Sequence, residues 1–179
     1  MKAVLQRVLD ASVGVEGTVH ASIARGLLIL LGVAQGDGEA QVEAMAKKIS
    51  GLRLFDDAQG KTNLSCEDIG GEFLVVSQFT LCADLTKGKR PGFEGAMRPP
   101  GSEQLYLRFC ERLAALTGRP VKTGKFGASM VVSLRNDGPA TYWFETESRI
   151  TNHASREESP SPRPPLGGQK EGDRSTRDS

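Results

Sequence analysis

Two short polar segments, residues 77–81 and 136–141, carry most of the chemical information in this chain. Each follows an apolar run with β-branched residues, so each lies where a strand ends in a turn. The first reads Ser77-Gln78-Phe79-Thr80-Leu81 and offers two hydroxyls, an amide and a row of backbone N–H donors. The second reads Asn136-Asp137-Gly138-Pro139-Ala140-Thr141, a corner shaped by glycine's freedom and proline's fixed φ. The pair predicts a site built from backbone geometry rather than from titrating side chains.

The side chains needed for several common mechanisms are scarce. A Ser-His-Asp or Cys-His mechanism would use His20 as its base, and the position of His20 in an early hairpin favours a solvent-facing side chain. No His, Cys or Asp cluster has metal-ligand spacing, and no glycine-rich phosphate loop is complete. The odd number of cysteines favours reduced thiols in a cytoplasmic protein; they are Cys66, Cys82 and Cys110. We therefore expect neither a metal nor another cofactor.

Thr80 allows two interpretations. A threonine hydroxyl needs a base or an N-terminal amine to become a nucleophile, and no base is evident in the sequence. Beside backbone N–H groups it could instead help to hold an oxyanion or a ligand hydroxyl. The alternative to either chemical role is a threonine that only packs at a strand end, and composition alone favours this packing interpretation.

Composition divides the chain of 179 residues into a domain and a tail. Apolar residues make up 38% and charged residues 25%, and the net charge of +1 gives no general affinity for polyanions. From Glu147 onward the chain is polar and proline-rich, with six basic and six acidic side chains. We predict a domain over residues 1–146 and a disordered polar tail over 147–179. The beginning of the chain lacks a long apolar run, which favours a cytoplasmic protein without a membrane segment.

Hydrophobic periodicity predicts the fold class. Residues 27–33 and 73–76 read as buried strands, and Glu16-Gly17 reads as a hairpin turn. One helix is predicted after Gly38, and a second is predicted from a Ser102 cap to Gly118. Further strands are predicted over 1–8, 12–15, 18–23, 128–134 and 142–144. The result is an α/β, layered, β-rich domain with two helices packed on mixed, largely antiparallel sheets.

In order and spacing, these segments resemble the D-aminoacyl-tRNA deacylases, also called D-tyrosyl-tRNA deacylases. Residues 77–81 and 136–141 look like the two signature motifs of that family. Further stretches match it over residues 1–8, 30–33, 90–93 and 124–128. The resemblance covers residues 1 to about 146 and stops at the tail.

The resemblance implies an activity and an assembly. The activity is hydrolysis of the ester of D-aminoacyl-tRNA, and of glycyl-tRNA mischarged on tRNA-Ala, as chiral proofreading in translation. The assembly is a homodimer in which Gly138-Pro139, as a cis peptide, reaches into the pocket of the other subunit. Its carbonyl groups would face the α-amino group of the substrate, and the close backbone would exclude an L side chain but admit glycine.

The resemblance also implies roles for particular residues. The backbone N–H groups around Phe79 and Thr80 would stabilise the developing oxyanion, while the 2′-hydroxyl of the terminal adenosine could take part in catalysis. The residues implied as catalytic are Ser77, Gln78, Phe79 and Thr80. Those implied in substrate binding are Gly138, Pro139, Met130, Phe126 and Arg7. Candidates for phosphate contacts are Lys87, Lys89, Arg90 and Lys125, although a solvated basic loop explains them equally well.

A second hypothesis places the function in the tail. The tail would bind nucleic acid or act as a scaffold, and Ser159-Pro160 and Ser161-Pro162 would be phosphorylation sites. The balanced charge of residues 147–179 argues against autonomous DNA affinity.

Overall fold

One long strand, β1 (Lys2–Val15), organises the sheet in the computed structural model, which describes residues 1–86 and 88–146. Its buried side chains alternate, with changes of phase between Leu5 and Val8 and between Val8 and Ala11. Ala3 and Leu5 therefore face one core, while Val8 and Val13 face another. The strands expected separately over 1–8 and 12–15 are thus one strand that bends, because its two halves bury opposite faces.

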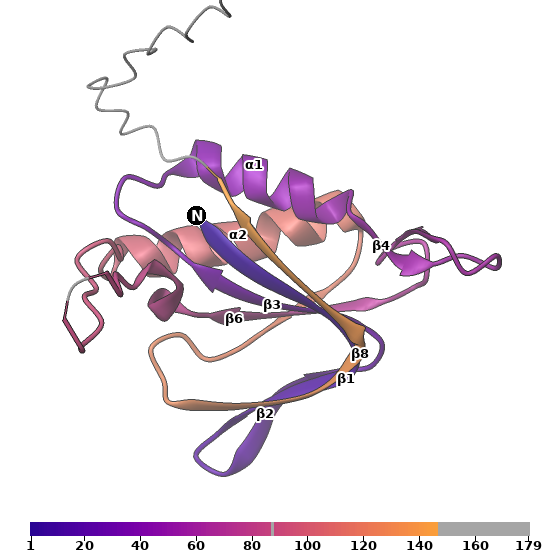
Figure 1. The fold of residues 1–179 in the computed structure, drawn as a ribbon, viewed down its shortest axis with the longest axis horizontal. Helices are drawn as coiled ribbons and strands as arrows, with labels where there is room; N and C mark the ends of the chain where they lie inside the picture. The colour runs from indigo at the N-terminus through magenta and orange to yellow at the C-terminus, as the bar shows by residue number, and fades with distance from the viewer. Residues whose placement is uncertain (87, 147–179) are drawn as a thin grey trace, which may run out of the picture.

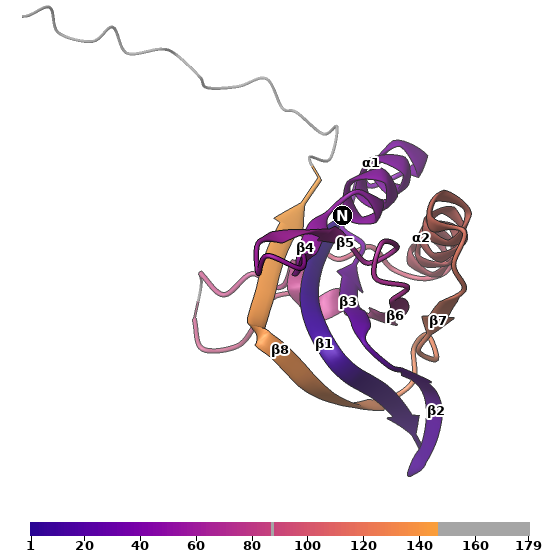
Figure 2. The same cartoon turned by 90° about the vertical axis from the view of Figure 1, so that its right-hand side faces the viewer.

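The sheet is mixed and mostly antiparallel, as the sequence predicts. β1 pairs antiparallel with β2 (Thr18–Ile23), β3 (Gly26–Gly32) and β8 (Met130–Glu145). β6 (Glu72–Ser77) runs parallel to β3, and β7 (Val121–Thr123) runs parallel to β6. A separate hairpin consists of β4 (Arg53–Asp56) and β5 (Thr62–Ser65). β1 and β8 curve together away from the helices towards β2, so the sheet curls like part of a barrel (Figure 2).

Both helices cover the same face of the sheet (Figure 1). α1 (Glu39–Ser50) buries Val42, Met45, Ala46 and Ile49, as the helical period predicts. α2 (Gly101–Thr117) buries Phe109 and Leu113 and ends at Gly118 in the left-handed conformation. The expectation of a Ser102 cap is wrong. Pro100 precedes the helix with helical backbone angles, so the helix begins before Ser102, which is buried inside its first turn.

Two hydrophobic clusters lie on opposite faces of the sheet. The larger one fills the space between the helices and the sheet and includes Leu27, Ile29, Phe73 and Phe109. The smaller one lies where the sheet curls, and Met130 packs against it from the start of β8. β3 contributes to both clusters, which confirms the expectation of a strand buried on both faces.

The two ends of the described domain meet in a buried contact. The Met1 ammonium group donates to Asp37 Oδ1 at 2.7 Å and to Thr146 Oγ1 at 2.9 Å. The Thr146 N–H donates to the carbonyl oxygen of Met1 at 2.9 Å. Residues 147–179, for which we predict disorder, lie outside the described residues, so the boundary at 146 stays a prediction.

Candidate active site

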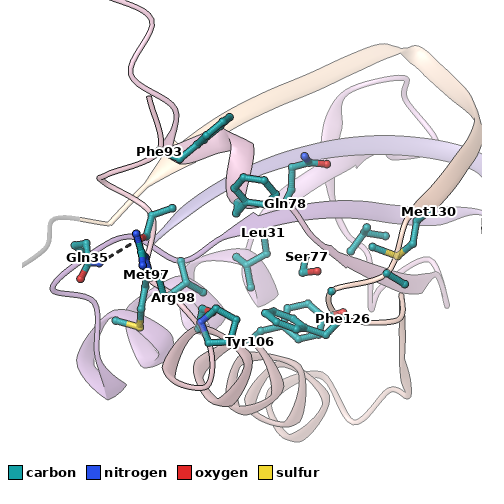
Figure 3. Close-up of a pocket in the computed structure, with 18 of the residues that line it drawn as sticks. Leu31, Gln35, Ser77, Gln78, Phe93, Met97, Arg98, Tyr106, Phe126 and Met130 are labelled. Carbon is teal, nitrogen blue, oxygen red and sulfur yellow. Dashed lines mark hydrogen bonds between the residues drawn. The ribbon is translucent and has the colours of Figure 1, made fainter. Parts of the chain in front are cut away.

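A cavity of about 890 Å³ lies beside the carboxyl ends of β3 and β6 (Figure 3). Leu31 and Ser77 mark these strand ends, and they are paired in the parallel ladder. α2 supplies Tyr106, and the turn before β8 supplies Phe126. The volume falls within the range of small-molecule sites, about 300–1,000 Å³. The carboxyl ends of parallel strands are a common place for ligands to bind in α/β sheets.

The first signature segment forms one wall of this cavity. β6 ends at Ser77, and a single 3₁₀ turn, η1 (Phe79–Cys82), follows. The Gln78 N–H donates to the carbonyl oxygen of Leu31 at 2.8 Å, which fixes the turn to β3. Phe79 and Thr80 begin the turn, and the first N–H groups of a helix have no intrahelical acceptor. Two backbone donors are therefore available next to the cavity.

Thr80 differs from its neighbours. Ser77, Gln78 and Phe79 line the cavity, whereas Thr80 is exposed beside it. The side-chain amide of Gln78 donates a hydrogen bond to Thr80 Oγ1. The hydroxyl of Thr80 is thus held as an acceptor by the amide, which favours a positioning role.

Phe126 and Met130 lie on one side of the cavity, and Ser77 and Gln78 lie nearer its middle (Figure 3). The rings of Phe126 and Tyr106 are 5.7 Å apart between centroids, and the Tyr106 hydroxyl donates to the carbonyl oxygen of Val75 at 2.8 Å. Burial raises the pKa of Tyr106 well above its ordinary value, so it stays a neutral hydrogen-bond donor. A Cβ at Gly124 would lie 2.8 Å from Met130 Sδ, so glycine leaves room for the methionine.

The second signature segment is a bulge within β8. Gln6 pairs with Thr141 and Val8 with Asn136, so Arg7 alone opposes residues 137–140. The Asn136 side chain spans the bulge: its amide donates to Thr141 Oγ1 at 2.9 Å and its oxygen accepts the Ala140 N–H at 3.2 Å. The expected corner between two strands is therefore a bulge in one continuous strand.

The expectation of a cis Gly138–Pro139 peptide is wrong for this structure. The cis peptide bond of the described residues is Pro99–Pro100 instead. Gly138 has a φ of +118°, a conformation open to glycine, and this angle supplies the change of direction within the bulge.

Arg7 on β1 holds the bulge of β8 in place through its guanidinium group. Its side chain is 11% exposed, and its Nε donates to the carbonyl oxygen of Asp137 at 3.1 Å. Its Nη1 donates to the carbonyl oxygen of Leu54 at 2.8 Å, and the carboxylates of Asp56 and Asp137 lie within 3.6 Å. A Cβ at Gly138 would lie 2.8 Å from Nη2 of Arg7. The arginine thus joins β1, β4 and β8 at one point.

The structure therefore separates the predicted residues into two groups. Ser77, Gln78, Phe79, Phe126 and Met130 line one cavity. Gly138, Pro139 and Arg7 lie together at the bulge and do not line that cavity. Phe93 and Arg98 also line the cavity and were missed. Phe93 stands next to a matched stretch, so the Arg-Pro-Gly-Phe run contained a signal, whereas nothing in the sequence pointed to Arg98.

The remaining titratable candidates show no catalytic arrangement. His20 is exposed on β2, as expected. The three cysteines are buried and free, and burial raises the pKa of the Cys66 and Cys110 thiols to about 12. Lys89, Arg90 and Lys125 are exposed, while Lys87 lies outside the described residues. Across residues 1–86 and 88–146, no three His, Cys, Asp or Glu side chains gather as metal ligands would.

The helices of the described part are also too short or too polar for a bilayer. Neither α1 nor α2 has the length and apolar character that a membrane-spanning helix requires.

Comparison with known proteins places the chain in a family. The family model described as D-Tyr-tRNA(Tyr) deacylase matches residues 4–145. A D-aminoacyl-tRNA deacylase of Magnetococcus marinus is 54% identical over 145 residues, which cover 81% of this chain and 96% of that protein. A D-aminoacyl-tRNA deacylase of Cereibacter sphaeroides is 53% identical over 146 residues, which cover 82% of this chain and all of that protein.

Two solved structures share the fold of this chain. A structure named c-Myc DNA Unwinding Element Binding Protein has a TM-score of 0.78 and 45% identity, covering 82% of this chain and 99% of that one. A probable eukaryotic D-amino acid tRNA deacylase has a TM-score of 0.64 at 19% identity, covering 80% of this chain and 97% of that one, and shares the fold. With the family model spanning the described domain and relatives above 50% identity, the chain belongs to the D-aminoacyl-tRNA deacylase family.

Proposed function

We propose that the cavity beside Ser77 and Gln78 is the active site for the reaction of this family, hydrolysis of D-aminoacyl-tRNA to a free D-amino acid and tRNA. The observation that supports this site is the pair of N–H donors at the start of η1, beside a cavity of about 890 Å³. Such donors suit an ester carbonyl that becomes an oxyanion.

This geometry supports the following course of the reaction. The ester carbonyl oxygen accepts hydrogen bonds from the N–H groups of Phe79 and Thr80, and water attacks the carbonyl carbon. The bond to the 3′-oxygen of the terminal adenosine then breaks, and this oxygen takes up a proton. The adjacent 2′-hydroxyl of the ribose is a proton relay that the substrate itself carries, which suits a site with no histidine in its lining. Phe126 and Met130 hold the adenosine against Ser77 and Gln78.

Chiral selection comes from a second copy of the chain. The bulge at Gly138-Pro139 is exposed and does not line the cavity of its own chain, which supports a homodimer in which each bulge completes the partner's pocket. Its backbone faces the α-carbon of the substrate and leaves space for hydrogen but not for an L side chain. Glycyl-tRNA has no side chain to exclude and is also cleaved. Arg7 positions this backbone through its bond to Asp137.

The direct test compares three charged tRNAs. The purified full chain should release D-tyrosine from D-tyrosyl-tRNA and leave L-tyrosyl-tRNA intact over the same time, with glycyl-tRNA-Ala cleaved as well. Equal rates on the D and L esters would contradict the chiral filter. No release from D-tyrosyl-tRNA at any enzyme concentration would contradict the proposed function itself.

A second candidate function is nucleic-acid binding, which one observation favours; its placement in the tail rests on the sequence alone. The solved structure at 45% identity is named as a DNA unwinding element binding protein. Deleting residues 147–179 separates the two functions, because deacylation should survive the deletion while binding through the tail should vanish. Residues 147–179 lie outside the described residues, so this function is argued from the sequence and the comparison alone.

A further inference from the structure

We propose that the active-site cavity continues into a second nucleotide site, in which Phe93 stacks on the base that precedes the terminal adenosine and Arg98 contacts the phosphate between them. The inference rests on the proposed function, because it requires the terminal adenosine in the cavity. The occupant is therefore the nucleotide that precedes the terminal adenosine in the single-stranded acceptor end of the substrate.

Two aromatic rings stand exposed where such a base would lie. Phe79 is 57% exposed and Phe93 is 36% exposed, and both line the cavity. Their centroids are 5.1 Å apart with the planes at 65°, an edge-to-face contact that leaves ring surface uncovered. Exposed aromatic faces beside a groove are the usual platform for unpaired bases, because every base has an apolar face to stack.

An unpaired cation lines the same cavity. Arg98 is exposed, and no ion pair among the described residues includes it. The arginines at 7, 108, 112 and 135, by contrast, all lie against carboxylates. A guanidinium without an acidic partner is free to bind a phosphodiester, which it matches in geometry. Its charge and the neighbouring rings therefore suit one ligand class, a nucleotide with its phosphate.

Backbone hydrogen bonds hold the segment that carries both side chains. Asp84 and Gly92 exchange two bonds, of 2.8 and 2.9 Å, just before Phe93. The Met97 N–H donates to the carbonyl oxygen of Val33 at 3.0 Å, next to Arg98. The segment that carries Phe93 and Arg98 is thus held by hydrogen bonds at both ends, so little ordering is needed when a base stacks on Phe93.

The positions in the cavity give the path of the substrate. Phe93 and Arg98 lie on one side, Phe126 and Met130 lie on the other, and Ser77 and Gln78 lie between them (Figure 3). With the terminal adenosine between Gln78 and Met130, the strand leaves the cavity past Phe93. The other occupant to consider at Phe93 is the side chain of an aromatic D-amino acid.

The test compares a long and a short substrate. D-tyrosyl-tRNA has the preceding nucleotides, whereas D-tyrosyl-adenosine has none. We expect Phe93→Ala to lower kcat/KM on the tRNA by roughly 5- to 100-fold, the value of one stacked base, mainly through KM. The loss on D-tyrosyl-adenosine should be at least about fivefold smaller. Phe93→Tyr keeps a ring and should restore most of the activity on the tRNA. Leu107→Ala, at an exposed leucine of α2, is the matched control and should leave kcat/KM unchanged on both substrates.

Arg98 gives an independent measurement. Arg98→Gln should raise KM for the tRNA and reduce the slope of log(kcat/KM) against log[salt] by about 0.7, the value for one lost contact with a single strand.

Each outcome has a defined meaning. Equal losses of Phe93→Ala on the two substrates would overturn the proposal, because Phe93 would then serve the adenosine. A loss that disappears when D-alanine replaces D-tyrosine on the tRNA would overturn it in favour of an amino-acid site. A wild-type chain that cleaves neither substrate would refute the proposed function, and this inference with it.

Discussion

The hydroxyl of Thr80 is held as an acceptor by the side-chain amide of Gln78. We expect Thr80→Val to retain substantial activity, within about tenfold of wild type, because backbone N–H groups carry the larger stabilisation of the oxyanion. Single-turnover hydrolysis of D-tyrosyl-tRNA measures the effect. Trapping an aminoacyl ester on Thr80 by acid quench and mass spectrometry would instead make this residue a nucleophile.

Glu72 predicts a pH-dependent contribution to stability. The Ala24 N–H donates to its Oε2 at 2.6 Å and the Lys122 ammonium group donates to its Oε1 at 2.9 Å, and both contacts hold the pKa of Glu72 below its ordinary value. The stabilisation is therefore complete above the unfolded pKa, about 4.3, and is lost as the pH falls through the lower folded pKa. We expect Glu72→Gln to lower the urea midpoint at pH 7 and to approach wild type below about pH 4. Glu67→Gln, on an exposed turn, is the control and should lower the urea midpoint at neither pH.

At the scale of the elements, the bulge of β8 depends on Arg7. Arg7→Met would remove the bonds to the carbonyl oxygens of Asp137 and Leu54, and would leave two carboxylates without their cation. We expect a loss of about 2–4 kcal/mol in the free energy of unfolding, since hydrogen bonds from a charged donor contribute about 1.5–3 kcal/mol each and partly overlap here. The ratio of D- to L-aminoacyl-tRNA hydrolysis should fall with it.

Arg53→Met is the matched control for Arg7. Arg53 is an exposed arginine on β4, the strand that Arg7 contacts from β1, and its Nη1 bonds only to the Asn63 side chain among the hydrogen bonds of the described residues. Its substitution should cost less than about 0.5 kcal/mol. Similar losses for the two variants in chemical denaturation would show that the bonds of Arg7 to the bulge carry no special weight.

The sequence predicted those elements whose pattern is local. α1 and α2 follow a helical period, and Glu16-Gly17 closes the expected hairpin. β7 was missed because its three residues are too few to show alternation. The phase changes in β1 and the bulge opposite Arg7 depend on pairing between strands more than a hundred residues apart, which no local pattern encodes.

The candidate site divides in the same way. The residues that follow β6 and those around the start of β8 line one cavity, although their strands are not neighbours in the sheet: β8 pairs with β1, and β3 lies between β1 and β6. Phe93 and Arg98 belong to irregular backbone fixed by hydrogen bonds to distant residues, so only the folded chain reveals that they line the cavity.

At the scale of the whole molecule, the proposed dimer with exchanged bulges makes a quantitative prediction. Ala128→Trp would fill the cavity, which Ala128 lines, and leave the bulge intact. Gly138→Leu would disturb the bulge, where the φ of +118° and the close Arg7 guanidinium leave no room for a side chain, and leave the cavity open. Each variant alone should be nearly inactive on D-tyrosyl-tRNA, with circular dichroism confirming that both are folded.

Mixing the two variants then tests the exchange. Subunit exchange under mild denaturant should restore activity, because a mixed dimer has one site with an intact cavity and an intact bulge. With random pairing half of the dimers are mixed, so about a quarter of the wild-type sites should be recovered, as an isologous interface requires. If each cavity used the bulge of its own chain, every mixed site would keep one defect and activity would stay at the level of the separate variants. If the wild-type chain sediments as a monomer at the assay concentration and is fully active there, the exchange is excluded as well.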